Sequence, residues 1–322
     1  MFSNTASVRV VFWGLCLLCL VPLLPLPSAV GSLVAPIALL SGVALALTVG
    51  NPYPVEARKW SKNLLQMSVV ILGFSMDVGK VAKAGQSGLI FSLVSITGIF
   101  LLGWALCRRL GMRSVTGFLV SAGTAICGGS AIAAVSSVID APEEDISVAV
   151  GTVFVLNALV LLVFPPIGHF LGLSQRQFGF WSGIAIHDIA SVVGAGASYG
   201  PVALDEATAV KLSRVLYLVP VIFVAKWIFR RQGKTGQAKG QIPWFVAFFL
   251  LAAALRTFIP AIHGFELDFK RVATTGFALA LFLIGTGLRR ETLRSVGVKP
   301  LLLGTTLWLT ISVATLLIVR LG

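Results

Sequence analysis

The sequence predicts an all-α membrane protein that crosses the bilayer about eleven times. Of its 322 residues, 57% are hydrophobic and only 11% are charged, and the mean hydropathy is +0.96. Globular domains contain about 25% charged residues, so this chain is too apolar to be one. Its apolar stretches are also long and continuous, whereas the strands of a membrane barrel alternate in hydropathy over about ten residues.

Eleven segments approach the roughly 20 residues that a transmembrane helix needs. They are residues 8–26, 30–50, 62–79, 86–107, 114–137, 145–171, 177–198, 206–229, 242–260, 270–288 and 298–321. Residues 1–28 also resemble a signal peptide, with one arginine, an apolar run and small residues near Ser28. Cleavage there would leave ten helices. We therefore expect a first helix or signal-like segment at 1–28 and one transmembrane domain at 29–322.

The net charge of +13 is placed as expected for orientation in a membrane, and we expect no nucleic-acid partner. If the N-terminus is cytoplasmic and every segment crosses, most basic residues fall on the cytoplasmic side, as the positive-inside rule requires. The C-terminus then lies outside. The cytoplasmic group is Arg9, Arg58, Lys59, Lys62, Arg108, Arg109, Arg113, Arg176, Lys226, Arg230, Arg231, Lys234, Lys239, Arg289, Arg290, Arg294 and Lys299. Lys80, Lys83, Lys270, Arg271 and Arg320 fall outside, with the acidic residues Asp140, Glu143, Glu144, Asp145, Asp205 and Glu206.

His187 and Asp188 lie side by side within the apolar, small-residue stretch 181–198. An ionisable group at the bilayer centre costs roughly 2.5–3.5 kcal/mol on insertion scales, so such a pair marks a polar cavity or a transport path. Histidine can donate to an anion or exchange a proton, and the aspartate can bind a cation or take up a coupling proton. The alternative is that each side chain is satisfied by a neighbouring helix and only fixes packing.

Gly128 and Gly129, followed by Ser130, interrupt the segment 114–137 near its middle. Two adjacent glycines let a helix unwind, and the N–H groups of the new helix start form an anion site. Small residues can instead allow close helix packing.

Lys211 and Arg214 lie about one turn apart early in the segment 206–229. Facing inward they would attract an anionic substrate, and facing outward they would snorkel to the headgroups. Asn157, Asn63 and Gln66 are amides within apolar segments that could line a cavity or form interhelical hydrogen bonds.

Short internal sequence similarities accompany these motifs. An offset of 60 residues pairs Gly123 with Gly183 and Asp145 with Asp205, and an offset of 159 pairs residues 116–118 with 275–277. The longer offset spans an odd number of segments and fits the inverted repeats of secondary transporters. The shorter one makes two segments parallel unless one is re-entrant, and the charge bias favours full crossings.

Several of these motifs together resemble the YeiH family of bacterial inner-membrane proteins, which are described as sulfate exporters. The resemblance rests on residues 127–132, Glu143-Glu144, Trp181-Ser182-Gly183, His187-Asp188, 191–193 and 210–212, and extends from Gly50 to the C-terminus. It implies a distant similarity to cation/proton antiporters and bile-acid symporters. Such a fold has five-helix inverted repeats, with crossed, broken helices beside a panel or dimerisation domain, and allows a homodimer. Gly129 and Ile189-Ala190 depart from the family pattern, which bears on the substrate.

We therefore expect a secondary transporter of the bacterial inner membrane that exports sulfate, sulfite or an organic sulfonate, coupled to a proton or sodium ion. The alternatives are a passive anion channel and a sodium-coupled organic anion symporter. We expect no enzyme activity and no cofactor, since no phosphate-binding GxxxxGK[ST] motif is present and adjacent His and Asp cannot easily form a triad. The expected substrate-binding residues are Cys127, Gly128, Gly129, Ser130, His187, Ser191, Lys211 and Arg214, and those for ion coupling are Asp188, His187 and Asn157.

Overall fold

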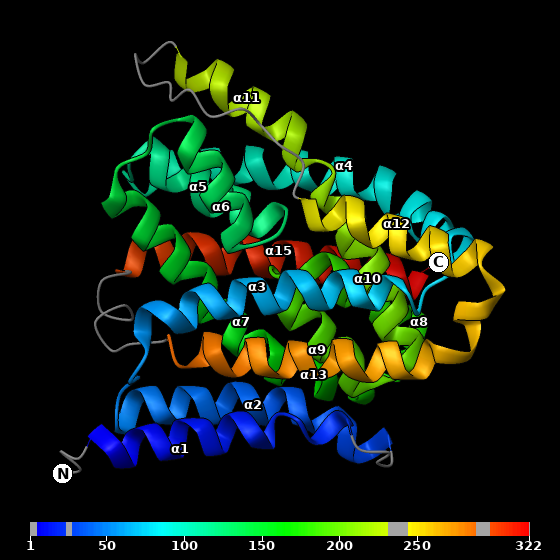
Figure 1. Ribbon diagram of the computed structural model, residues 1–322. Helices are drawn as coiled ribbons and strands as arrows, with labels where there is room; N and C mark the ends of the chain where they lie inside the picture. The colour runs from blue at the N-terminus through cyan, green and yellow to red at the C-terminus, as the bar shows by residue number, and fades with distance from the viewer. Residues whose placement is uncertain (1–4, 24–27, 231–243, 288–296, 322) are drawn as a thin grey trace.

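The computed structural model describes residues 5–23, 28–230, 244–287 and 297–321, and every regular element in these ranges is a helix (Figure 1). The elements are α1 (Thr5–Leu18), η1 (Val21–Leu23), α2 (Ser28–Thr48), α3 (Pro54–Gly73), α4 (Val78–Arg109), α5 (Ser114–Ala125), α6 (Gly129–Val138), α7 (Glu143–Phe170), α8 (Gln175–Ala185), α9 (Ile189–Tyr199), α10 (Pro201–Val215), α11 (Leu218–Arg230), α12 (Trp244–Phe258), η2 (Pro260–Phe265), α13 (Glu266–Gly285) and α15 (Val298–Leu321).

Four helical stretches of the described residues are long and apolar enough to cross a membrane. They are Ile90–Arg109, Glu143–Phe170, Pro201–Phe229 and Val298–Leu321. A fifth span is added if Ala247–Phe258 and Pro260–Gly285, between which the chain bends by 109°, count as one. The predicted all-helical membrane class is confirmed. Each of the eleven predicted segments corresponds to one helix or to a pair of consecutive shorter helices.

The predicted segment 114–137 is not one helix but a helical hairpin, α5–α6. Arg113, just before α5, forms ion pairs of 2.9 Å with Glu144 and 3.2 Å with Asp145, both at the start of α7. Further in, a Cβ atom on Gly123 would lie only 2.9 Å from the side chain of Ile132, nine positions later. Since nine residues of continuous helix rise by about 13 Å, α6 must fold back along α5.

The predicted segment 177–198 forms a second hairpin, α8–α9. The amide of Val202 donates to the side chain of Gln175 at 2.9 Å, and the Tyr199 hydroxyl donates to the carbonyl of Leu173 at 2.6 Å. The rings of Phe178 and Tyr199 stack with centroids 3.8 Å apart. The start of α8 and the end of α9 therefore lie together.

The two hairpins enter the bundle from opposite ends, because α7 runs the length of the molecule between them (Figure 1). The expectation that both segments cross the bilayer completely is therefore wrong. It also misplaced two charged groups. Arg113 and Asp145, which were predicted on opposite sides, form an ion pair at one end of the molecule. Arg176 and Arg320, also predicted on opposite sides, share the other end, because the Arg320 side chain donates to the carbonyl of Leu171, just before α8, at 2.9 Å.

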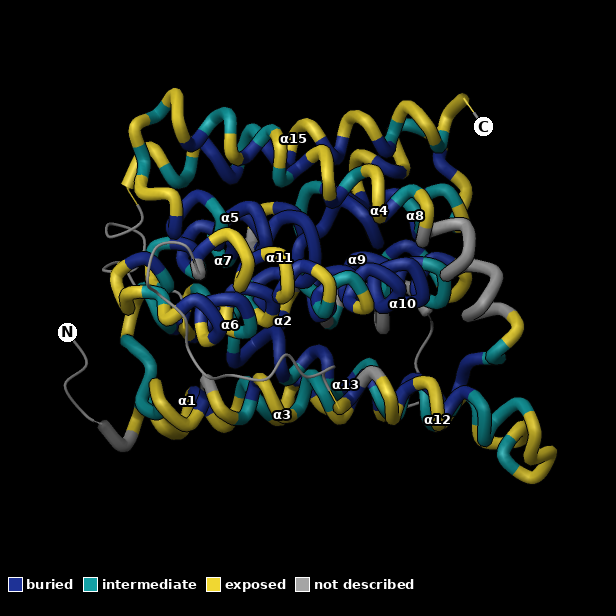
Figure 2. The backbone as a smooth tube through the Cα atoms, turned by 90° about the horizontal axis from the view of Figure 1, so that it is seen from above, coloured by how far each residue is buried: buried dark blue, intermediate teal, exposed yellow. Residues whose placement is uncertain are grey.

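The hairpins lie between two outer layers of helices. Viewed from above, α15 forms one side and α1, α3, α12 and α13 form the other, with the buried helices of the hairpins and α10 between them (Figure 2). The outward face of α15 is apolar, as contact with lipid requires. Its exposed residues include Leu302, Leu309, Val313 and Leu317.

Small residues allow α2 to pack closely against α13 of the second outer layer. A Cβ atom on Gly42 of α2 would clash with the backbone of Phe282, and one on Gly285 of α13 would lie 3.0 Å from the amide nitrogen of Val43. Such contacts stabilise helix pairs in membranes, where no hydrophobic force draws helices together. The layer therefore forms a firm wall beside the hairpins.

Candidate functional site

The tips of the two hairpins meet in the interior of the molecule. A Cβ atom on Gly128, at the tip of α5–α6, would lie 3.2 Å from the Cβ atom of Asp188, at the tip of α8–α9. Gly128 has φ +64° and ψ −131°, a conformation that side chains disfavour. Glycine therefore serves both the backbone turn and the close approach of the two tips: the predicted helix break is present, and the predicted close packing is present with it.

Two buried cations bind the C-terminal ends of α5 and α8, the first helix of each hairpin. Arg214 donates from Nε to the carbonyl oxygen of Ala125 at 3.1 Å and from Nη2 to the same oxygen, and its Nη1 donates to the Ser95 hydroxyl at 2.9 Å. Lys211 donates from Nζ to the carbonyl of Ile186. Both cations thus offset the partial negative charge at the ends of α5 and α8.

Lys211 and Arg214 both come from α10 and have no exposed surface. The alternative that they snorkel to the headgroups is therefore wrong. Neither residue lines the cavity described below, so the hairpin tips separate their positive charges from the cavity.

The N-terminal ends of α6 and α9, the second helix of each hairpin, are capped differently. Asp188 is the N-cap of α9: its carboxylate accepts from the amide of Ser191 at 2.9 Å and from the Ser191 hydroxyl at 2.6 Å. The N-cap of α6 is Gly128, which has no side chain to accept a hydrogen bond. The partial positive charge at the start of α6, at Gly129 and Ser130, therefore has no such cap.

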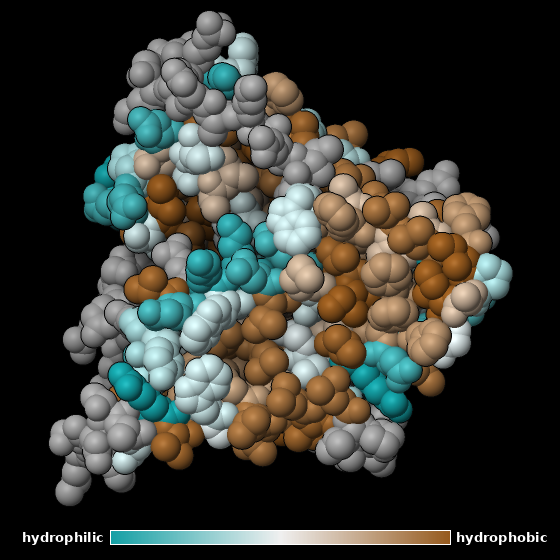
Figure 3. Space-filling model, in the orientation of Figure 1, coloured by the Kyte–Doolittle hydropathy of each residue, from teal (hydrophilic) through white to brown (hydrophobic). Residues whose placement is uncertain are grey.

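A cavity of about 560 Å³ extends from the hairpin tips toward the end of the molecule where α3 begins. Hydrophilic residues gather between α6 and α3 on the face shown in Figure 3. The residues around the cavity are Leu39, Ser61, Lys62, Leu65, Gln66, Cys127, Gly129, Ser130, Ala133, Ala134, Ile146, Val150, Phe154, Asn157, Asp188, Ile189, Ser191, Leu218, Phe245, Leu281 and Ile284. Most of this wall is apolar, and its polar groups concentrate at the tips and in the middle of α3, at Ser61, Lys62 and Gln66.

Asn157 of α7 is one of the residues around this cavity, and its side-chain amide is buried without a partner among the described residues. Its side chain is 4% exposed, and neither Oδ1 nor Nδ2 forms a hydrogen bond among the described residues. An unsatisfied buried polar group costs about 1–3 kcal/mol, so a partner supplied by a ligand would stabilise it. Asn157 is therefore the clearest single pointer to a bound molecule.

The structure brings some predicted site residues together at the cavity and leaves others outside it. Cys127, Gly129, Ser130, Asn157, Asp188 and Ser191 line the cavity, while Gly128, Lys211 and Arg214 support the tips. Gln66 lines it as well, whereas Asn63 is exposed elsewhere on α3. Several apolar wall residues, including Leu39 and Phe245, were missed because a single sequence does not show which helices adjoin the tips.

His187 occupies a different position from its neighbour Asp188. It is fully buried, it does not line the cavity, and both ring nitrogens lack a hydrogen-bond partner among the described residues. In the conformation observed, the imidazole is therefore not placed to contact a molecule in the cavity.

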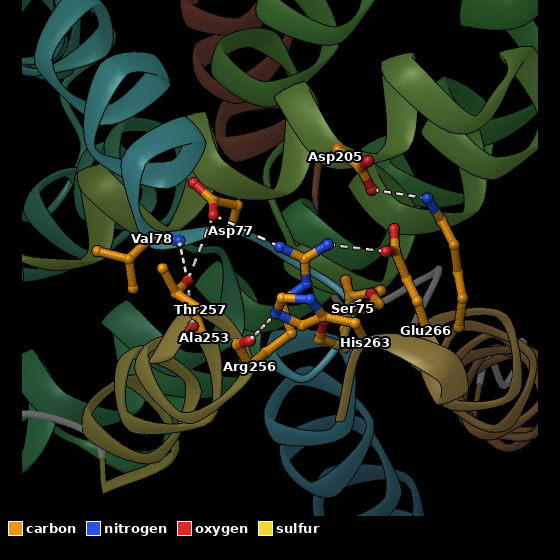
Figure 4. A network of polar contacts seen from close by, with 11 residues as sticks. Ser75, Asp77, Val78, Asp205, Ala253, Arg256, Thr257, His263 and Glu266 are labelled. Carbon is orange, nitrogen blue, oxygen red and sulfur yellow. Dashed lines mark hydrogen bonds and ion pairs between the residues drawn. The ribbon is translucent and has the colours of Figure 1, made fainter. Parts of the chain in front are cut away.

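At the opposite end of the molecule, ion pairs join α10 and α12 to α13 and to the turn between α3 and α4. Arg256 contacts Asp77 at 3.4 Å and Glu266 at 2.9 Å, and Lys270 contacts Asp205 at 2.8 Å (Figure 4). The last pair links the second hairpin's neighbour, α10, to the outer layer. This end is thereby tied together while the other end opens into the cavity.

Comparison with known proteins identifies related sequences. Residues 16–304 match the family model Conserved hypothetical protein 698. A UPF0324 membrane protein of Bacteroides thetaiotaomicron is 44% identical over 283 residues, which cover 87% of this chain and 84% of the relative. One from Bdellovibrio bacteriovorus is 43% identical over 322 residues, covering 99% and 96%, and one from Porphyromonas gingivalis is 46% identical over 287 residues, covering 88% and 86%. No solved structure matches.

Proposed function

The chain belongs to the UPF0324 membrane proteins, the family described as Conserved hypothetical protein 698, and we propose that it is a secondary active transporter of a small anion. The proposed substrates are sulfate, sulfite or an organic sulfonate. Transport occurs by alternating access, which exposes the hairpin tips first to one side of the bacterial inner membrane and then to the other.

The observation that supports this function best is the end of the cavity at two opposed hairpin tips. There the cavity is bordered both by the uncapped start of α6 and by Asn157, whose amide has no partner among the described residues. Backbone N–H groups at a helix start bind anions, and an asparagine amide adds a further donor. Helices broken at the membrane midplane are a recurrent device of secondary transporters.

The distribution of basic residues supports a cytoplasmic position for the open end. Lys59, Lys62, Arg108, Arg109 and Arg113 all lie near the end where α3 and α5 begin, as the positive-inside rule requires of the cytoplasmic side. The acidic group around Asp145 shares this end, but acidic residues contribute little to that rule. The N-terminus is then cytoplasmic, the C-terminus is outside, and the cavity accepts its substrate from the cytoplasm, as an exporter does. Lys234, Lys239, Arg289, Arg290 and Arg294 lie outside the described residues.

Asp188 is the group best placed to couple transport to a proton or sodium ion. Its carboxylate lines the cavity beside the start of α6, and it accepts two hydrogen bonds from Ser191. His187, the other coupling candidate, is separated from the cavity in this conformation and would need a movement of the tip to take part.

A channel would need a continuous path past the tips. All residues around the cavity come from the tips or from the helices on their open side, and none comes from α8 or α10. The ion pairs at the far end further separate the cavity from that side. These features favour a transporter over a passive channel, and sodium-coupled symport of an organic anion stays an alternative for the experiment.

Counterflow in liposomes tests the proposal. Purified protein is loaded with unlabelled sulfate, sulfite or alkanesulfonate and exchanged against the labelled anion at two pH values, with and without sodium. We expect saturable exchange of at least one anion at a rate that depends on pH or on the presence of sodium. Transport that does not saturate and is unaffected by pH and sodium would indicate a channel, and absence of exchange for every anion would refute the proposal.

A pair of asparagine variants locates the site. Asn157→Leu removes the unpartnered amide at the tips and should reduce exchange at least tenfold, whereas Asn63→Leu changes an exposed amide outside the cavity and should leave it unchanged. Equal exchange in the two variants would place the substrate elsewhere.

A further inference from the structure

The hairpin tips bring together four helix ends and three charged side chains, of which Lys211 and Arg214 are fully buried and Asp188 borders the cavity. The ends are the C-termini of α5 and α8 and the N-termini of α6 and α9. Each C-terminus contributes about half a negative charge and each N-terminus about half a positive one, so the four ends cancel in sum. The net charge of the region is therefore set by its side chains.

Lys211 and Arg214 each add one positive charge and Asp188 adds one negative charge, which leaves a net charge of one positive unit. Arg214 and Lys211 donate to carbonyl oxygens, and both carboxylate oxygens of Asp188 accept, which is the hydrogen-bond pattern of two cations and one carboxylate. The other ionisable side chains at the tips, His187 and Cys127, are buried, and both ring nitrogens of His187 lack a hydrogen-bond partner among the described residues, so we count both side chains as neutral.

Charged groups farther away do not alter this sum. Asp145 is buried at the base of the first hairpin, where it pairs with Arg113 and accepts from the Thr116 hydroxyl. Lys62 lines the cavity but is exposed, so water and salt screen it. It can draw anions into the cavity without belonging to the buried region.

The wall of the cavity adds a second condition on the ligand. Beside the polar tips it presents the aromatic rings of Phe154 and Phe245 and the aliphatic side chains of Leu65 and Ile189. A cavity of about 560 Å³ with such a wall suits a ligand that has an apolar part as well as a charged head. An inorganic anion would leave much of this wall against water.

We infer that the site binds an organic anion with a single negative charge, such as a short alkanesulfonate or carboxylate, whose charge neutralises the one positive unit at the hairpin tips. This inference rests on the proposed transport function and specifies its substrate class. The oxygens of the head accept from the start of α6 and from the Asn157 amide, and the apolar part lies along Phe154. A doubly charged anion leaves an excess negative charge buried and is disfavoured.

Competition in the counterflow assay tests the charge rule with probes whose charge does not vary with pH. The probes are butanesulfonate, with one negative charge, and ethanedisulfonate and sulfate, each with two. We expect butanesulfonate to compete at a concentration at least about tenfold lower than either dianion, since one uncompensated charge in a partly buried site is costly. Equal or better competition by both dianions would overturn the inference while leaving anion transport intact.

Removal of the negative charge at the tips should shift this preference. Asp188→Asn keeps an N-cap for α9 and raises the net charge to two positive units, so the ratio should move at least about tenfold toward ethanedisulfonate. Glu144→Gln removes a carboxylate that is 73% exposed at the hairpin base and should not change the ratio. An unchanged ratio in folded Asp188→Asn protein would contradict the charge sum. The wild-type ranking decides the question if that variant does not fold, and absence of all exchange by the wild type would refute the proposed function itself.

Discussion

The adjacent glycines at the first hairpin tip should respond in opposite ways to alanine. Gly128 has φ +64° and forms the N-cap of α6, whereas Gly129 is the first helical residue and its φ is not positive. Since both substitutions add the same methyl group one residue apart, their difference isolates the backbone requirement at the tip.

The structure gives the size of this difference. At Gly128, alanine must adopt a conformation that costs about 1–3 kcal/mol. Its methyl carbon would also lie 3.2 Å from the Cβ atom of Asp188 and 3.4 Å from a methyl carbon of Val153. At Gly129, the nearest atom is a Phe154 ring carbon at 3.4 Å, and a helical alanine is more favourable than glycine by up to about 1 kcal/mol.

Thermal unfolding of the detergent-purified variants measures the effect. Gly128→Ala should lower the apparent melting temperature by several degrees, and Gly129→Ala should leave it unchanged or raise it slightly. If Gly129→Ala is as destabilising as Gly128→Ala, the pair serves helix packing in general and the turn at Gly128 is not the reason for the motif.

Three further outcomes follow from the same geometry. Arg214→Gln removes charged hydrogen bonds to the Ala125 carbonyl and should reduce stability by about 1.5–3 kcal/mol, as measured by thermal unfolding; an unchanged melting temperature would contradict the role of this arginine at the end of α5. Asn157→Leu should achieve its reduction of exchange of at least tenfold without lowering the melting temperature, because the amide has no partner among the described residues; a large loss of stability would instead assign it a structural role. Lys270→Gln breaks the ion pair with Asp205 and should change stability by less than about 1 kcal/mol, yet it should speed labelling of cysteines introduced on α10 from the outer side; unchanged labelling would show that the pair does not hold that end closed.

Hydropathy predicted where the apolar segments lie but not how two of them fold. One membrane-spanning helix of 24 residues and a hairpin of two shorter helices can have the same amino-acid composition. Hydropathy alone therefore predicts a single span for the segment that contains Gly128. The glycine pair was predicted to interrupt its segment, and a break lies there; no break was predicted at His187-Asp188, where the second one lies. The direction of each chain reversal depends on contacts such as the ion pair of Arg113 with Asp145. A topology in which every apolar segment crosses the membrane places these two residues on opposite sides.

The partners of the buried charges were also beyond the sequence. Lys211 and Arg214 were predicted either to face a substrate or to snorkel, and both side chains bind backbone carbonyls instead. Every residue has a carbonyl, so no residue type marks such an acceptor. Ser95, which accepts from Arg214, has no distinguishing pattern around it either.

In the proposed transport cycle, the single positive unit at the hairpin tips gives the membrane voltage a role. With the anion bound and no coupling ion at Asp188, the tips carry no net charge, so their movement would be insensitive to voltage. The empty site carries one positive charge, on which a potential of 100 mV acts with about 2.3 kcal/mol across the full membrane. A negative cytoplasm therefore draws the empty site inward, where the next anion is loaded, and the resting potential of the cell itself would favour export.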